Sequence, residues 1–157
     1  MPEAHPYRRV LALISFDNTA ETIARKALLL ARLNRAQLVF LHLIEPDAAL
    51  DGGYPAASAK LNADSLEAGA VRRLDFMAAQ LGAGEAECIA RHVSTRQATN
   101  PVLQSLQPDL VVAATEFGLQ PGSYDVLILG QGRRPKGGRL VSRLMGWLGG
   151  SFQPAAL

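Results

Sequence analysis

The sequence lacks most features that would place it in a specialised class of protein. It has one cysteine, Cys88, so an internal disulfide is excluded and nothing indicates an oxidising compartment. No apolar run approaches the roughly 18–20 residues that cross a bilayer. Residues 1–9 hold no apolar stretch of the kind found in a secretion signal. With 48% hydrophobic residues the chain is too apolar for disorder, and we expect one domain-sized unit in the cytoplasm.

Catalytic and metal-binding patterns are also missing. The histidines, His5, His42 and His92, have no second ligand at metal spacing, so we expect no metal site. No Cys–His pair or G-x-S-x-G sequence supports nucleophilic hydrolysis. We interpret His42, inside an apolar run, as structural, and Cys88 as a small buried hydrophobe. We expect no enzyme; the alternative, a weak ATP hydrolase, lacks a general base and a metal motif.

Acidic residues are absent after Asp125. Residues 126–157 therefore carry a net charge of +5, whereas the part of the chain before them carries −3. A cationic end on an acidic body suits an anionic partner or surface. We do not expect nucleic acid to be that partner, because aromatic residues make up only 6% of the chain and no known reading motif is present.

What the chain does have is an alternation of strand and helix patterns. Continuous apolar runs, typical of strands buried on both faces of a parallel sheet, occur at residues 10–14, 38–44, 110–114 and 126–129. Residues 87–95 complete the set as a further strand. Helical patterns lie between the first four strands, at residues 18–33, 65–81 and 97–107. The order predicts an α/β fold, with an open five-stranded, mostly parallel sheet flanked by helices.

The helix starts carry their own signals. Asn18 and Glu21 have the spacing of a capping box, which places the start of the first helix there. Asp64 or Ser65 is the expected cap of the second helix. Residues 46–58, rich in Pro, Gly, Asp and Ala, are interpreted as the loop before it.

Taken in order, several of these segments resemble the universal stress protein family, over residues 8–130. One is the first strand with Asp17-Asn18 behind it, and another is the second strand within residues 36–46. The long loop and helix before the third strand fit as well. Residues 108–115 match the family's entry to its fourth strand, an aspartate followed by an apolar run. The resemblance implies an adenine nucleotide alpha hydrolase-like, Rossmann-like fold, a homodimer and a role in the stress response.

The family's nucleotide site is only partly reproduced. Nucleotide-binding members have an aspartate directly after the first strand and a G-x2-G-x9-G-S/T loop after the fourth, whose N–H groups approach phosphates closely. Here Ser15 follows the first strand, the glycines after the fourth are too close together, and Glu116 would repel phosphate. Asp17 could hold a ligand or only help to start the helix.

A ligand in this fold would lie at the carboxyl ends of the strands, where the strand order reverses. The candidate residues for such a site are Ser15, Asp17, Leu43, Thr115, Gly118, Gly130 and Gly132. Our first expectation is that the chain uses no cofactor; if it binds one, the resemblance points to ATP or AMP.

The connection to the fifth strand is short. Only residues 116–124 join it to the fourth, whereas a parallel crossover usually needs a dozen or more. Residues 126–129 could therefore pair antiparallel, lie at an edge, or exchange with a second subunit. Because an apolar edge strand is usually covered, we expect a homodimer.

We divide the chain into a stress-protein-like domain, residues 1–130, and a basic C-terminal segment, residues 131–157. The segment begins with a glycine-rich linker and ends in an amphipathic stretch that could lie on a membrane or dock in a partner. It could also be the family's fourth helix, or pack on its own sheet. Its candidate phosphate- or partner-binding residues are Arg133, Lys136, Arg139, Arg143 and Trp147.

The function predicted from these observations is that of a non-catalytic, regulatory binding module that acts as a homodimer in the stress response and contacts a protein partner. A nucleotide sensor is the first alternative. An adaptor that docks on a membrane or a partner through its basic segment is the second.

Overall fold

The computed structural model describes residues 7–45, 56–95, 98–116 and 118–130. Within these ranges, residues 56–62 are described by their backbone alone. Five parallel strands form one sheet in the order β3-β2-β1-β4-β5. The strands are β1 (Arg9–Leu13), β2 (Gln37–Ile44), β3 (Glu87–His92), β4 (Leu110–Ala113) and β5 (Asp125–Ile128). The helices are α1 (Ala20–Asn34), α2 (Ala56–Gln80) and α3 (Thr99–Leu106). The predicted fold class is confirmed.

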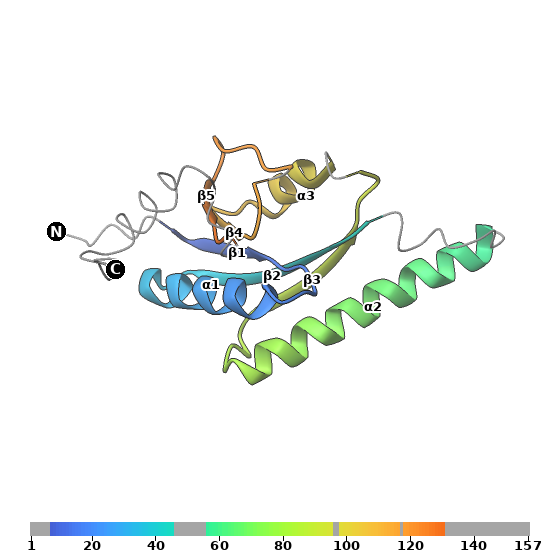
Figure 1. Cartoon of the computed structure of the whole chain (residues 1–157), viewed down its shortest axis with the longest axis horizontal. Coiled ribbons are helices and arrows are strands. Elements are labelled where there is room, and N and C mark those ends of the chain that lie inside the picture. Colours follow the sequence, from blue (N-terminus) through green and yellow to red (C-terminus); the bar gives the residue numbers. More distant parts are fainter. Residues whose placement is uncertain (1–6, 46–55, 96–97, 117, 131–157) are drawn as a thin grey trace, which may run out of the picture.

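The sheet is the middle of three layers (Figure 1). Helices α1 and α2 cover one face, and α3 covers the other. Alternate residues of β1 divide between the two cores: Val10 and Ala12 pack toward α1, and Leu11 packs toward α3. Both kinds of side chain are fully buried, which explains why the central strands are apolar at every position.

The two helix starts differ from the prediction. Helix α1 begins at Ala20 with Thr19 as its N-cap residue, so Asn18 and Glu21 form no capping box. Helix α2 begins at Ala56, well before Asp64 and Ser65, so those residues lie within the helix and do not cap it. The last three residues of the expected loop, 56–58, are therefore helical, and residues 46–55 lie outside the described part of the chain.

Strand β5 pairs in parallel with β4 of its own chain, from Leu110 opposite Asp125 to Ala113 opposite Ile128. The antiparallel alternative is therefore wrong. Exchange of this strand with a second subunit stays a prediction. The edge position is confirmed. A parallel connection without a helix is possible here because the linking segment itself covers the sheet.

The connection from β4 to β5 packs on the α3 side of the sheet. Leu119 and Tyr124 are buried in the core between the sheet and α3. The Tyr124 hydroxyl donates a hydrogen bond to Oδ1 of buried Asn100 at 2.7 Å and accepts one from the Gln120 N–H at 3.1 Å. Gly118 has a φ of +77°, a left-handed turn that glycine adopts without strain. One side chain network thus takes the place of a crossover helix.

Candidate functional site

The carboxyl ends of the parallel strands meet at one edge of the sheet, and four of the predicted ligand residues lie there. Ser15 and Thr115 follow β1 and β4 within two residues and are exposed. Strand β1 pairs with β2 along one of its edges and with β4 along the other. The strand order therefore reverses between β1 and β4, and Ser15 and Thr115 lie on either side of that point. Half-buried Leu43 lies near the end of β2, and exposed Gly130 follows β5.

Other predicted residues fall elsewhere. Gly118 is part of the β4–β5 connection, half-buried, and Glu116 beside it is exposed. Gly132 and the candidates of the basic segment lie outside the described residues. These are Arg133, Lys136, Arg139, Arg143 and Trp147.

The Asp17 carboxylate acts on the start of helix α1. Its Oδ1 accepts a hydrogen bond from the Thr19 N–H at 2.8 Å and another from the Thr19 hydroxyl. Both donors belong to the N-cap residue of α1. Of the two interpretations left open by the sequence, this geometry favours the helix start. A role for Asp17 in ligand binding stays a prediction.

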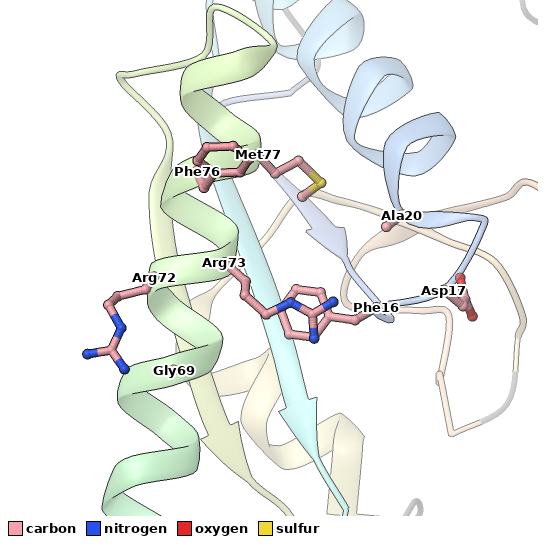
Figure 2. A pocket seen from close by; sticks show the side chains of 8 residues that line it. All are labelled: Phe16, Asp17, Ala20, Gly69, Arg72, Arg73, Phe76 and Met77. Atoms are coloured by element: carbon pink, nitrogen blue, oxygen red, sulfur yellow. The ribbon is translucent and has the colours of Figure 1, made fainter.

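Beside this loop, three side chains from different elements form a stack. The Phe16 ring stacks on the His42 imidazole, with 4.1 Å between ring centroids. The Arg73 guanidinium lies over the Phe16 ring (Figure 2). Its central carbon is 3.9 Å from the ring centroid. Sequence reasoning missed Phe16 and Arg73, because they are far apart in the chain and share no motif. The one available signal was a phenylalanine directly after Ser15 at the strand end.

His42 is held in one orientation by the backbone. Its Nδ1 lies 2.7 Å from the Ile14 carbonyl oxygen, which can only accept, so Nδ1 carries the proton and donates it. Burial lowers the pKa of His42 and nearby Arg73 lowers it further, whereas the bond to Ile14 and the charge of Glu45 oppose the shift. The imidazole is therefore neutral near pH 7, as expected for a structural residue.

A groove opens between the start of α1 and the middle of α2. Its volume is about 480 Å³. The residues that line it are Phe16, Asp17, Ala20, Gly69, Arg72, Arg73, Phe76 and Met77. In Figure 2, Arg73 and Met77 point from α2 toward Phe16 and Ala20, whereas Arg72 points away from them. No sequence pattern predicted this groove, since its walls come from two helices that are not adjacent in the chain.

Within the described ranges, no three His, Cys, Asp or Glu side chains gather in a way that could hold a metal ion. None of the described helices combines the length and apolarity needed to span a membrane. Half-buried Cys88 has a pKa raised to about 12 by burial and by the neighbouring Asp75 carboxylate, so its thiol stays protonated and unreactive.

The fold and the sheet edge define a doubly wound α/β protein of the kind that binds ligands where the strand order reverses. A family model for the universal stress protein family matches residues 6–116. The chain therefore belongs to the universal stress protein family. Its amino-acid sequence has no significant match among curated proteins.

Solved structures support this fold assignment. A universal stress protein family member from Burkholderia pseudomallei has a TM-score of 0.59 at 18% identity, covering 82% of this chain and 99% of its own. A universal stress protein in complex with cAMP has a TM-score of 0.51 at 17% identity, with 79% and 97% covered. The Arabidopsis thaliana family protein At3g01520, with AMP bound, has a TM-score of 0.50 at 11% identity, with 83% and 97% covered.

Proposed function

We propose that this chain is a non-catalytic binding module of the stress response, which acts as a homodimer and takes an adenine nucleotide at the β1–β4 edge. The observation that carries the proposal is the position of exposed Ser15 and Thr115 on either side of the strand-order reversal. Similar folds hold cAMP and AMP in the solved structures of two relatives.

The residues at this edge suit a ligand with little charge. Ser15 and Thr115 offer hydroxyls that bond to ribose or to a single phosphate, and half-buried Leu43 offers an apolar contact for a base. Exposed Glu116, next to Thr115, repels phosphate oxygens, and this repulsion grows with each charge on the ligand. We therefore expect AMP or cAMP to bind more tightly than ATP.

The nucleotide proposal is tested by calorimetry with AMP, cAMP and ATP on two matched variants. Ser15→Tyr fills the sheet edge and should weaken AMP binding at least about tenfold, which corresponds to about 1.4 kcal/mol. Ser105→Tyr makes the same change on an exposed face of α3 and should leave binding unchanged. Glu116→Gln should improve ATP more than AMP. If none of the three nucleotides binds the wild type at millimolar concentration, the nucleotide proposal fails.

Absence of catalysis is tested separately with the same variants. We expect no hydrolysis of ATP above that of the buffer, because among the described residues no three His, Cys, Asp or Glu side chains gather to hold the metal ion that phosphoryl transfer usually needs. Turnover that disappears in Ser15→Tyr but persists in Ser105→Tyr would overturn the non-catalytic assignment.

The edge strand β5 is the proposed dimer surface. Among the described residues β5 pairs on one side only, with β4, and its Val126 and Ile128 side chains are half-buried. Sedimentation equilibrium should give a dimer for the wild type and a monomer for Ile128→Lys. The control is Leu33→Lys on α1, where the leucine is 67% exposed. A monomeric wild type at micromolar concentration contradicts the dimer, and dissociation by Leu33→Lys alone moves the interface to α1.

The basic segment remains a separate proposal. The boundary at residue 130 and the docking role of residues 131–157 rest on the sequence alone, with its net charge of +5. If the segment docks on membranes, deletion of residues 139–157 should abolish binding to anionic liposomes, and that binding should survive moderate salt in the full chain.

A further inference from the structure

The groove between α1 and α2 is lined by apolar side chains and by two arginines that form no ion pair with any described residue. We propose that it binds a small anion that carries a flat apolar group, such as an aryl phosphate or an aryl carboxylate. This site lies on the α2 side of Phe16 and Asp17 rather than between β1 and β4, so it goes beyond the nucleotide function proposed above.

Two exposed arginines of α2 belong to the lining of the groove: Arg73 reaches over Phe16, whereas Arg72 points away from Phe16 and Ala20 (Figure 2). Among the residues whose side chains are described, neither guanidinium has a carboxylate within 4.0 Å. By contrast, Arg9, Arg25, Arg32 and Arg91 each form an ion pair. The one acid of the groove, Asp17, already accepts two hydrogen bonds from Thr19. The groove therefore keeps donors for an anion, and guanidinium groups bind phosphate and carboxylate through paired N–H bonds.

Arg73 is positioned before any ligand arrives. Its guanidinium lies over the Phe16 ring, and that ring is stacked in turn on His42, whose orientation is fixed by the Ile14 carbonyl. Because this contact to the ring uses no N–H group as a hydrogen-bond donor to a carboxylate, the guanidinium can still donate to an anion. Holding the group in advance reduces the entropy that binding would cost.

The apolar part of the ligand has surfaces to contact. Phe76 is 66% exposed on α2, although phenylalanine is usually buried, and half-buried Met77 and Phe16 lie beside it in the groove. The volume of about 480 Å³ is within the usual range for small-molecule sites. An anion without an apolar group would leave this surface in water, and a neutral aromatic would leave the arginines unused.

The methyl groups of methionine give a direct readout. The chain has three methionines, so the methyl spectrum is simple, and Met77→Leu assigns the signal in the groove. Titration of the full chain with 1-naphthyl phosphate should shift the Met77 signal in a saturable way. Inorganic phosphate and 1-naphthol, each at the same concentrations, should bind at least about fivefold more weakly. A Met77 signal that does not move, or equal affinity for 1-naphthol, overturns the proposal.

Substitutions test the contribution of each arginine and distinguish the groove from the nucleotide site at the sheet edge. Arg72→Gln and Arg73→Gln should each weaken 1-naphthyl phosphate binding about threefold to fivefold, the effect of one exposed charge pair. Arg72→Gln leaves the stack on Phe16 intact, and Arg25→Gln on α1 is the control that should have no effect. Ser15→Tyr should block AMP at the sheet edge but not 1-naphthyl phosphate in the groove. Wild-type affinity in both arginine variants, or loss of 1-naphthyl phosphate binding in Ser15→Tyr, contradicts a separate site.

A titration with AMP indicates which class of ligand the groove takes. AMP is itself an anion with a flat base, so it could occupy the groove as well as the sheet edge. If AMP shifts the Met77 signal in Ser15→Tyr, the groove accepts nucleotides. If only 1-naphthyl phosphate and 1-naphthoate do so, the groove takes other aryl anions. Either result supports the site, and failure of AMP at the sheet edge would not affect it.

Discussion

The Tyr7 hydroxyl donates a hydrogen bond to Oδ2 of Asp125 at 2.8 Å, across 118 positions of the sequence. Tyr7 lies before β1, and Asp125 is the first residue of β5. Since β4 separates these two strands in the sheet, the bond reaches over β4 at the amino end of the sheet. It joins the start of the domain to its edge strand, which has no helical connection of its own.

Removal of this bond should destabilise the domain modestly. Tyr7→Phe keeps the buried ring and loses only the hydroxyl, so we expect a loss of about 1 kcal/mol in the free energy of unfolding, measured by urea denaturation. A double-mutant cycle with Asp125→Asn isolates the pair. Additive effects of the two substitutions would show that the hydroxyl and the carboxylate are not coupled.

The hydrogen bond between Tyr7 and Asp125 predicts that the stability of the domain depends on pH in the alkaline range. Burial and the bond to Asp125 raise the pKa of Tyr7 to about 12, against about 10 in the unfolded chain. The folded state therefore holds the proton more tightly, and the resulting stability is complete below pH 10 and is lost as the pH rises toward 12. The difference in stability between wild type and Tyr7→Phe should narrow over that range. A constant difference from pH 8 to 12 would contradict the shift.

Loss of the hydrogen bonds of Tyr124 to Asn100 and Gln120 should lower the free energy of unfolding more than loss of the Tyr7 hydroxyl does. Tyr124→Phe leaves buried Oδ1 of Asn100 and the Gln120 N–H without a partner, so we expect a loss of about 2 kcal/mol in urea denaturation. The control is Ser105→Ala, which removes an exposed hydroxyl on α3 and should change stability by less than about 0.5 kcal/mol. Similar losses in both variants would mean that the network does not hold the connection.

Helix α2 contains a glycine that alanine should improve. A Cβ added at Gly69 would meet only the Arg72 side chain, at 4.0 Å, which is an ordinary contact. Gly69→Ala should therefore stabilise the domain by about 1 kcal/mol and raise Tm by about 2–4 °C in a calorimetric scan. Gly82, just after the helix, has open space around it but a φ of +71°, so Gly82→Ala should lower Tm. If both variants shift Tm in the same direction, the difference in backbone conformation between Gly69 and Gly82 does not decide the effect of alanine.

The stack beside the groove predicts how His42 titrates. Its pKa lies below the ordinary value of about 6.5, chiefly because of burial and also because of Arg73. The folded state binds this proton more weakly than the unfolded state, so stability is complete above pH 6.5 and falls as the pH drops through it. An NMR titration should show a low pKa for His42, and Arg73→Gln should raise it. An unchanged pKa in Arg73→Gln would rule out the electrostatic contact.

The sequence predicted the strands well because the sheet is buried on both faces. β1, β4 and β5 each begin and end within one residue of the apolar run that indicated them. The start of α2 was missed, because residues 56–64 have no apolar stripe and Asp64 and Ser65 suggested a cap. The direction of β5 could not be predicted, because the minimum length of a parallel crossover assumes that a helix covers the sheet. Here Leu119 and Tyr124 of the β4–β5 connection cover the sheet instead.

Part of the candidate site could also be predicted from the sequence, and part could not. Ser15 and Thr115 could be placed from sequence because a residue that follows a parallel strand must lie at the carboxyl edge. The stack of Phe16, His42 and Arg73 depends on how α2 crosses the sheet, and no local pattern contains that information.

The central strand β1 has consequences for how the chain is made. Its one edge pairs with β2, which follows closely in the sequence, but its other edge waits for β4. The Asp109 carboxylate that accepts hydrogen bonds from the Arg8 and Arg9 N–H groups arrives equally late. At ordinary rates of translation, the stretch between β2 and β4 takes on the order of 3 to 13 s to synthesise. During that interval one edge of the apolar strand β1 has no partner strand, a condition that favours aggregation of incompletely folded chains.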